Sequence, residues 1–314
     1  MSFKIAVTGG SGFIGSHIVS ALEKSNHEVF VIDKINSINH KNYFAIDIND
    51  TSTLENFFKE KSIDYVYHIA AVANARRSVE DVLETVDVNI RGTASVLLAS
   101  SNTGIKKVIL ASTVWVYNAV DKPKNLNSGI VILNEDSPIS PSCGNHFYTT
   151  SKLTSEFLCH DFNFFKNLKF TILRYGIPYG PRMWKGLVLR AFTENAMAGK
   201  PLTITGDGSA KRRFVHIDDL ASAHVLALSE KADNEIFNLE GDADVTIKEL
   251  AELVSKNIDN TKVEFIIDES RKGELSTDNI EISNKKAKEV LGWKVNVDIK
   301  QGVKSYIDWH KNSN

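Results

Sequence analysis

The chain has 314 residues, a formal net charge of −2 and 42% hydrophobic residues, which suits one large α/β domain or a domain with a smaller lobe. Mixed charges without a long basic tract argue against a nucleic-acid partner, and no apolar run approaches the roughly 20 residues of a membrane span. The two cysteines, Cys143 and Cys159, lack metal-ligand or redox spacing, so we expect a cytoplasmic protein without a bound metal or a membrane partner.

Short apolar runs alternate with amphipathic stretches through the first half of the chain. Strands are expected at Ile5–Val7, Val29–Ile32, Tyr43–Ile46, Tyr65–Ala71, Val108–Ser112 and Phe170–Tyr175. Helices are expected between them at Gly12–Ser25, Leu54–Lys59, Val79–Ser101 and Tyr148–Phe165. Nearly continuous apolar strands separated by helices predict an α/β fold with a Rossmann-type, doubly wound parallel sheet.

The later part of the chain departs from this alternation. The stretch Asn118–Phe147 is rich in Pro, Asn, Ser and Asp and is predicted to be a long loop. After Tyr175 the pattern loosens, with Gly and Pro at short intervals. We expect residues 1–175 to form a Rossmann domain and residues 176–314 mainly a smaller lobe over the carboxyl edge of its sheet. A helix near residues 215–230 is expected to return to the first domain.

A glycine-rich turn follows the first strand. Gly9, Gly12 and Gly15 stand where a tight turn would let the backbone approach a pyrophosphate, whose charge then lies at the amino end of a helix. The spacing is one residue wider at its start than the usual dinucleotide fingerprint. The alternative interpretation is a helix start that happens to be rich in glycine.

Acidic residues follow the second and third predicted strands. Asp33 lies about 20 residues beyond the glycine turn, where a carboxylate accepts hydrogen bonds from the adenosine ribose. It would repel a 2′-phosphate, which favours NAD over NADP, although the adjacent cation Lys34 weakens this argument. Asp47 is expected to reach the adenine amino group or, alternatively, to form a turn at the end of its strand.

Tyr148 and Lys152 are four residues apart and therefore share one face of a helix. A free tyrosine has a pKa of roughly 10 and is a poor base at neutral pH. A neighbouring ammonium and the positive ring of a nicotinamide cofactor would favour the phenolate. Lys152 is also expected to hold the nicotinamide ribose. Placed after a glycine turn, the pair predicts redox chemistry on a hydroxyl or carbonyl, with a surface Tyr/Lys pair as the alternative.

The sequence resembles the extended short-chain dehydrogenase/reductases, specifically the NAD-dependent nucleotide-sugar epimerase/dehydratase family of which UDP-glucose 4-epimerase is typical. The resemblance covers nearly the whole chain. It rests on Gly9–Gly15, His68–Ala71, Asn89–Thr93, Thr113–Tyr117, the Tyr148/Lys152 pair, Tyr179–Arg182 and Arg212–Asp219. It implies that Thr113 completes a catalytic set with Tyr148 and Lys152 by hydrogen-bonding the reacting oxygen.

The resemblance also implies binding residues. The cofactor contacts that it implies are Gly9, Gly12, Phe13, Ile14, Gly15, Asp33, Lys34, Asp47, Ile48, Ala70, Ala71, Asn89, Ser112, Tyr148, Lys152 and Tyr175. The substrate contacts that it implies are Thr113, Tyr148, Arg182, Arg212 and Arg271. Two of these arginines, Arg212 and Arg271, would clamp the substrate diphosphate by charge-assisted bonds. Arg213 is a rival for the role of Arg212, and solvated surface charge is the alternative for all three.

Several positions depart from the family pattern. Family 4,6-dehydratases carry Asp-Glu directly after the catalytic Ser/Thr, but here Val114 and Trp115 stand there and cannot transfer protons. The usual dehydratase mechanism and its decarboxylase relative are therefore disfavoured. Ile177 replaces an asparagine that relatives use near the substrate phosphates. Cys143 or His146 is either an extra acid/base or a loop residue without a catalytic role.

The leading hypothesis is an NAD-dependent epimerase of a nucleoside-diphosphate sugar, acting at carbon 4 through a transient 4-keto sugar. The alternatives are a nucleotide-sugar ketoreductase, an atypical nucleotide-sugar dehydratase and, from a different class, a non-catalytic NAD-binding regulator. The intact acid/base set argues against the regulator, because a sensor needs no proton transfer.

The resemblance further implies a homodimer. In relatives, the helices that correspond to Val79–Ser101 and Tyr148–Phe165 pair across a two-fold axis into a four-helix bundle. Apolar residues recur at helical spacing in both helices: Val82, Leu83 and Val86 in the first, and Leu153, Phe157 and Phe164 in the second. Such stripes more often pack within one chain, so the pattern alone leaves both interpretations open.

Overall fold

The computed structural model describes residues 2–119, 130–140, 146–259, 261–266 and 280–313. Its centre is a seven-stranded parallel sheet with the strand order β11-β7-β5-β4-β1-β2-β3. The strands are β1 (Lys4–Thr8), β2 (Glu28–Ile32), β3 (Tyr43–Phe44), β4 (Tyr65–His68), β5 (Lys107–Thr113), β7 (Phe170–Tyr175) and β11 (Glu235–Leu239). The order reverses between β1 and β4, and a crevice at the carboxyl ends of strands forms at such a switch point.

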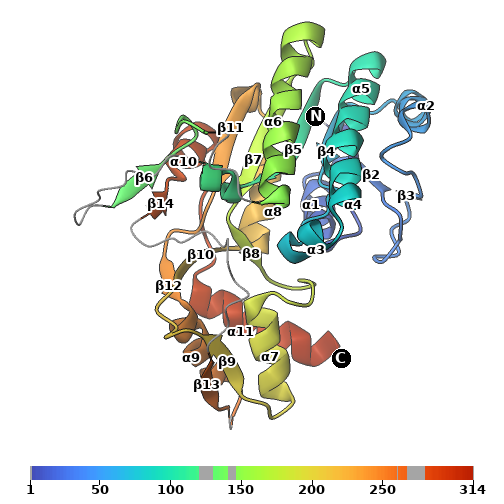
Figure 1. The fold of residues 1–314 in the computed structure, drawn as a ribbon. Coiled ribbons are helices and arrows are strands. Elements are labelled where there is room, and N and C mark those ends of the chain that lie inside the picture. Colours follow the sequence, from blue (N-terminus) through green and yellow to red (C-terminus); the bar gives the residue numbers. More distant parts are fainter. Residues whose placement is uncertain (1, 120–129, 141–145, 260, 267–279, 314) are drawn as a thin grey trace.

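Helices cover both faces of this sheet (Figure 1). On one face, α1 (Phe13–Lys24) packs against α8 (Ile217–Leu226). On the other face, α2 (Thr51–Lys61), α5 (Gly92–Thr103) and α6 (Phe147–Lys166) pack side by side. Successive side chains of a strand point to opposite faces, so Ile5 and Val7 enter one core and Ala6 the other. The predicted Rossmann-type α/β fold is confirmed.

Below the carboxyl edge of the sheet, a second group of elements forms a lobe (Figure 1). It contains the three-stranded sheet of β8 (Ile177–Tyr179), β10 (Lys211–His216) and β12 (Asp244–Thr246). It also contains β9 (Leu202–Thr205) paired with β13 (Val263–Ile266), and the helices α7 (Val188–Met197), α9 (Ile247–Asn257) and α11 (Ile299–Ser313). Beside β11 lie α10 (Lys285–Leu291) and the 3-10 turn Glu230–Ala232.

The helix predicted over Val79–Ser101 is wrong as one continuous element. The chain instead forms α3 (Ala75–Glu80), α4 (Val82–Val86), a π-helical turn (Asp87–Arg91) and α5. The break falls at Asp81, whose extended φ of −131° ends α3. Its carboxylate accepts a hydrogen bond from the Glu84 N–H at 2.9 Å and so caps the start of α4.

Other boundaries also differ from the prediction. The strand predicted at Tyr43–Ile46 ends at Phe44, and the strand predicted at Tyr65–Ala71 ends at His68. The 3-10 helix Val114–Ala119 follows β5, and part of the predicted loop forms β6 (Val131–Leu133), which pairs with β14 (Ile280–Ile282). The rest of that loop lies partly outside the described residues. None of the helices in the described ranges has both the length and the hydrophobicity of a membrane span.

Candidate functional site

The glycine turn lies between β1 and α1 and packs so closely on neighbouring backbone that side chains would not fit at two of its positions. Gly9 has a φ of +70°, and a Cβ there would approach the Ala70 nitrogen to 2.6 Å. A Cβ on Gly15 would come within 2.1 Å of the Gly9 carbonyl oxygen. No side chain caps α1 at Gly12, so its first-turn amides face the turn. This cradle fits the pyrophosphate of a dinucleotide.

Asp33 follows β2 at the edge of the same cradle. Its carboxylate accepts hydrogen bonds from the Ser11 N–H at 3.0 Å and from the Lys34 N–H at 2.7 Å. These bonds fix the carboxylate beside the turn, in the place predicted for ribose recognition. The buried Ser11 hydroxyl has no partner within the described part of the chain, which also fits a polar ligand at this point.

The other predicted cofactor contacts fall into two groups. Phe13 and Ile14 begin α1 directly after the glycine turn, the Ala70 backbone packs on Gly9 and is followed by Ala71, and Ile48 packs against Gly92. Lys34 and Asp47 are exposed. Three further side chains bind within the protein: the Asn89 amide bonds Val72 and Ser151, the Ser112 hydroxyl donates to Glu156, and the Tyr175 hydroxyl bonds His224. Their contacts with a cofactor stay predictions.

Tyr148 lies in the first turn of α6, and Thr113 lies at the end of β5. The two are brought together across 35 residues of sequence, and the Thr113 hydroxyl lies close enough to the Tyr148 phenol to lower its pKa. Burial raises the pKa of Tyr148 to about 12, and Thr113 acts in the opposite direction. In this structure the phenol is therefore protonated at neutral pH.

Lys152 lies one helical turn after Tyr148 and is buried, with a relative exposure of 4%. Its Nζ donates a hydrogen bond to the Ala111 carbonyl oxygen at 2.9 Å. Burial lowers the pKa of Lys152 to about 8, partly countered by Glu156. The ammonium is held by β5, and the effect of Lys152 on the Tyr148 phenolate stays a prediction. Two N–H donors of the ammonium are left for a ribose.

A buried ion pair below the site was missed by the sequence analysis. Arg174 of β7 donates two hydrogen bonds to Glu156 of α6, at 3.0 and 2.7 Å. Ser112 donates to the same carboxylate, and Arg174 also donates to the Tyr117 hydroxyl at 3.0 Å. Glu156 follows Lys152 by one helical turn, which predicts only that the two share a helix face. Its partner Arg174 lies on a strand, and no local sequence pattern predicts this contact.

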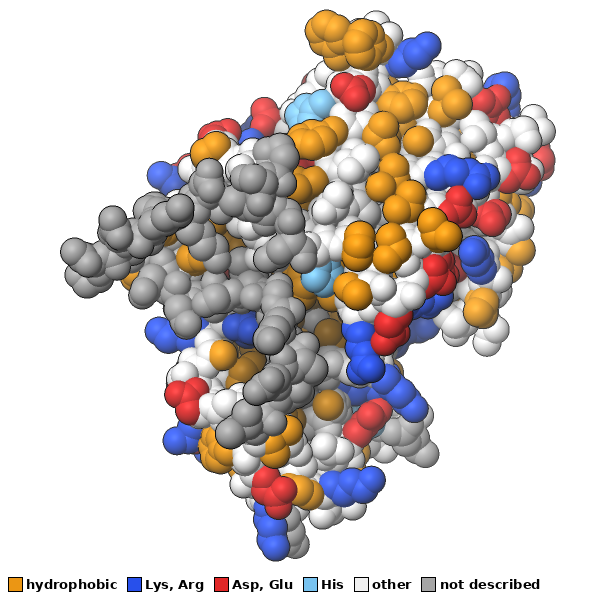
Figure 2. All heavy atoms as spheres, in the orientation of Figure 1, with side chains coloured by type: hydrophobic (Ala, Val, Ile, Leu, Met, Phe, Trp, Pro, Cys, Tyr) orange, Lys and Arg blue, Asp and Glu red, His pale blue; other side chains and the backbone are white. Residues whose placement is uncertain are grey.

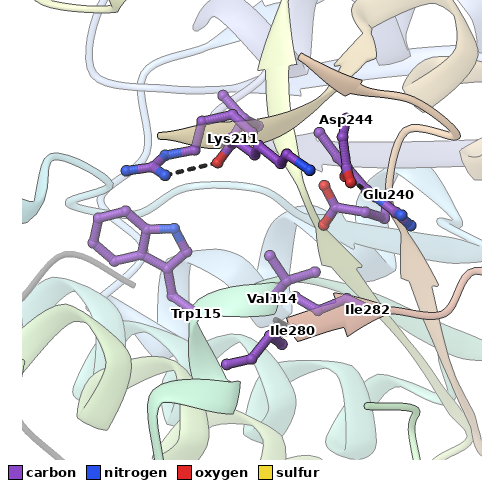
Figure 3. Close-up of a pocket in the computed structure, with 10 residues that line it drawn as sticks. Val114, Trp115, Lys211, Glu240, Asp244, Ile280 and Ile282 are labelled. Carbon is purple, nitrogen blue, oxygen red and sulfur yellow. Dashed lines mark hydrogen bonds and ion pairs between the residues drawn. The ribbon is translucent and has the colours of Figure 1, made fainter. Parts of the chain in front are cut away.

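A pocket opens beyond Trp115, with about 560 Å³ of empty volume that is partly open to solvent (Figure 3). It is lined by Val114, Trp115, Ile177, Lys211, Arg212, Arg213, Glu240, Asp244, Ile280 and Ile282. The indole of Trp115 lies 6.4 Å from the Tyr148 ring, centroid to centroid, so the pocket adjoins the Tyr148 site. Glu240 was not identified from sequence.

The predicted substrate arginines are not all together. Arg212 lines the pocket, and its guanidinium donates to the Lys211 carbonyl oxygen at 2.8 Å. Arg213 is held by two carboxylates, Asp244 at 2.7 Å and Glu281 at 3.3 Å. Arg182 is exposed, on a turn anchored by a hydrogen bond between His17 and the Pro181 carbonyl. Arg271 and Cys143 lie outside the described residues.

His146 directly precedes α6 and completes an aromatic group with Trp115 and Tyr148. Its ring centroid is 5.6 Å from that of Trp115 and 6.5 Å from that of Tyr148. Burial lowers its pKa, so the imidazole is neutral at pH 7. Its position is compatible with either interpretation made from the sequence. No group of acidic, His and Cys residues in the described ranges is arranged to hold a metal ion.

Comparison with known proteins identifies the family of this chain. The profile of the NAD dependent epimerase/dehydratase family matches residues 5–239. A Methanocaldococcus jannaschii protein, provisionally named a UDP-glucose 4-epimerase, is 34% identical over 320 residues, which cover 99% of each chain.

Two solved structures resemble the whole chain. The UDP-glucose 4-epimerase of Thermotoga maritima, solved with UDP-glucose, has a TM-score of 0.86 at 31% identity, over 99% of each chain. The UDP-glucuronic acid 4-epimerase of Bacillus cereus, solved with UDP-glucuronic acid and NAD, has a TM-score of 0.84 at 29% identity. That alignment covers 99% of this chain and 100% of the other. The chain is therefore a member of the NAD-dependent epimerase/dehydratase family and uses NAD.

Proposed function

We propose that the protein epimerises a nucleoside-diphosphate sugar at carbon 4. The observation that carries this proposal is the proximity of Tyr148 to Thr113 in a fold that also holds the dinucleotide cradle. Val114 is buried and Trp115 lines the pocket, at the positions where dehydratases that resemble this chain place Asp and Glu. This arrangement supports moving one proton and one hydride at a single carbon rather than removing water.

In the proposed reaction, the Tyr148 oxygen takes the proton from the sugar hydroxyl and later returns it. Thr113 orients the reacting oxygen through a hydrogen bond. Bound NAD supplies the hydride acceptor, and its positive ring favours the Tyr148 phenolate. Lys152 holds the nicotinamide ribose from its position on the Ala111 carbonyl. The transient 4-keto sugar rotates between the two transfers, so the hydride returns to the opposite face.

Arg212 is proposed to bind the substrate diphosphate. Arg212 and Arg213 both line the pocket, and Arg213 pairs with Asp244 and Glu281, so the family resemblance is what favours Arg212 between these two rivals. Ile177 is apolar at a position where relatives use an asparagine near the phosphates. Arg212 and Arg271 would then supply more of the phosphate contacts. Arg182 and Arg271 stay predictions, as does the cytoplasmic location.

The domain division is also kept as a proposal. Residues 1–175 would bind NAD, and residues 176–314 would mainly bind the substrate. Two observations support the expected return of later segments to the first domain: α8 packs against α1, and β11 pairs with β7. The pocket lies where the β10 and β12 strands of the lobe face the residues that follow β5 (Figure 3).

The proposed activity is tested by supplying a panel of UDP- and dTDP-sugars to purified protein and following products by NMR. We expect interconversion of two sugars that differ only at carbon 4, without addition of a reductant. Tightly retained NAD, visible in the ultraviolet spectrum of the protein, is expected as well. A requirement for stoichiometric NADPH would support the ketoreductase instead, and a 4-keto-6-deoxy product the dehydratase.

The position of Asp33 predicts cofactor preference. Apo-protein should bind NAD more tightly than NADP, because the fixed carboxylate accepts ribose hydroxyls and repels a 2′-phosphate. Replacing Asp33 by Ser should narrow the difference in affinity between NAD and NADP by about tenfold or more, since the repulsion between the carboxylate and the 2′-phosphate is removed. Titration of both cofactors by calorimetry measures this. Equal or tighter NADP binding by the unaltered protein would remove the argument from Asp33.

A symmetric homodimer is the proposed assembly. In the first predicted stripe, Leu83 is 81% and Val86 44% exposed; in the second, Phe157 is 59% and Phe164 79% exposed. Leu153 is instead buried in the core. Hydrophobic side chains gather on the face formed by these helices (Figure 2). An apolar face of this kind on a soluble protein typically marks an interaction site, and a second copy of the chain suits the family resemblance.

Charged substitutions test this assembly. Replacing Leu83 and Phe157 by Glu should convert a dimer to a monomer at micromolar concentration, because four carboxylates would be buried in one symmetric interface. Replacement of Ile35 by Glu is the control, since this side chain is 71% exposed on a loop outside the stripes. Light scattering gives the mass. A monomeric unaltered protein would contradict the proposal.

A further inference from the structure

A buried carboxyl group faces the pocket without a hydrogen-bonding partner. Glu240 directly follows β11 at the carboxyl edge of the main sheet and is only 4% exposed. Within the described part of the chain, no group hydrogen-bonds its carboxyl oxygens. The carboxyl group lines a pocket that is partly open to solvent, so its hydrogen-bonding capacity is available to water or to a ligand. A ligand in the pocket would replace that water and bond the carboxyl group.

The surrounding backbone is shaped to admit this carboxyl group. A Cβ on Gly176 would lie 2.7 Å from a Glu240 carboxylate oxygen, so the carboxyl group packs directly on the Gly176 backbone. On the other side, a Cβ on Gly241 would lie 2.2 Å from the Phe214 carbonyl oxygen, so the chain after Glu240 runs tightly against β10. Between these two contacts, the Glu240 side chain lines the pocket (Figure 3).

Within the described ranges, Glu240 forms no ion pair. The charge of Arg213 acts on it, but the Arg213 guanidinium is bound to Asp244 and Glu281. Asp244 itself acts on Glu240 as a like charge. Burial is the main cause that raises the pKa of Glu240 to about 8, so at neutral pH the carboxyl group is protonated. It then presents one donor and one acceptor.

The opposite side of the pocket is an aromatic ring. Trp115 forms one wall, and Val114 and Ile282 add apolar surface near Glu240. A ring with one apolar face and several hydroxyls suits this combination, because the apolar face packs on the indole while hydroxyls bond the carboxyl group. The pocket adjoins Tyr148 through Trp115, which is where the sugar of a nucleotide sugar would have to lie.

We propose that Glu240 is a specificity-determining residue that hydrogen-bonds hydroxyl groups of the substrate sugar in the pocket walled by Trp115. This inference rests on the proposed function and deepens it, because it assigns the recognition of a neutral, hydroxyl-bearing sugar to a particular side chain. Glu240 is not placed in proton transfer. It acts on binding of the sugar and not on binding of the nucleotide or of NAD.

The test measures how much the sugar adds to affinity. Calorimetry with NAD-loaded protein would compare UDP with UDP-glucose, and dTDP with dTDP-glucose. Glu240→Met keeps the approximate volume and removes both hydrogen bonds, whereas Glu240→Gln keeps a donor and an acceptor. Glu235→Gln is the matched control, because Glu235 begins β11, the strand that leads to Glu240, and pairs with Lys286 outside the pocket.

In the unaltered protein, one of the two nucleotide sugars should bind more tightly than its free diphosphate, because the glucose adds affinity. Glu240→Met should remove about tenfold of that gain while leaving the affinity for the free diphosphate and NAD unchanged. Glu240→Gln should restore most of the gain, and Glu235→Gln should behave as the unaltered protein. If Glu240 has only a structural role, Glu240→Met should change the affinities for NAD, free diphosphate and nucleotide sugar together, or should change none of them. Either result overturns the proposal.

Failure of the wider function is distinguishable from failure of this inference. If the unaltered protein binds neither diphosphate nor its glucose conjugate, the nucleotide-sugar assignment is wrong and the inference falls with it. If the unaltered protein gains affinity from glucose and Glu240→Met keeps that gain, only the role of Glu240 is wrong. A diphosphate that binds without any gain from glucose also overturns the role of Glu240, but leaves the nucleotide site standing.

Discussion

Replacing Tyr148 by Phe should lower turnover about 10²–10⁴-fold, the usual contribution of a general acid/base. The substitution removes one hydroxyl from a partly buried ring whose neighbours, Trp115 and His146, stay in place. The fold and the affinity for NAD should therefore be unchanged. Thr113 would lose its polar neighbour, a smaller effect that adds to the loss of the proton-transfer group.

This prediction is measured by single-turnover kinetics together with NAD titration on the same sample. Tyr65→Phe is a matched control, because Tyr65 lies at the amino end of β4, away from the carboxyl ends of the strands. Near-normal turnover in Tyr148→Phe would mean that the base lies elsewhere. His146 is the first alternative, and a loss of activity in His146→Gln would then identify it.

Breaking the buried ion pair should have the largest effect on stability. Arg174→Met removes the partner of Glu156, and the two residues are 2% and 3% exposed. Leaving an uncompensated buried charge costs about 3–5 kcal/mol. We therefore expect the free energy of unfolding to fall by that amount in urea titrations at pH 7. Tyr117 also loses the guanidinium that donates to its hydroxyl.

The double variant Arg174→Met with Glu156→Leu tests whether the unpaired charge causes the loss of stability. It removes both charges and fills their volume with apolar atoms, so much of the lost stability should return. Lys169→Met is the control for a surface pair, since Lys169 is 54% exposed and bonds Asp233. A loss below about 1 kcal/mol in Arg174→Met would show that the pair behaves like a surface salt bridge.

The parts of the site that sequence predicts well are those set by local geometry. A glycine turn between a strand and a helix has few conformations, so Gly9 and Gly15 identify the cradle directly. The four-residue spacing of Tyr148 and Lys152 gives a shared helix face without any tertiary information. It does not reveal that the Ala111 carbonyl binds the lysine, because that contact depends on how α6 packs on β5.

Tertiary contacts account for what sequence did not predict. Glu240 follows a strand as many surface acids do, yet it is buried in the pocket and packs on Gly176, a contact that sequence does not predict. Helical spacing placed Leu83 and Leu153 in similar apolar stripes, yet one is exposed and the other buried. Periodicity marks an apolar face but not what covers it. The predicted long helix failed for a local reason, the cap at Asp81.

The central claim is that one hydride leaves carbon 4 of a nucleotide sugar and returns to its other face. It is tested most directly with a substrate that carries deuterium at carbon 4, identified by the panel described above. We expect the epimer to keep the deuterium at carbon 4, with no loss to solvent and no net reduction of NAD. Release of the label to water, or its transfer to another carbon, would contradict epimerisation by this route.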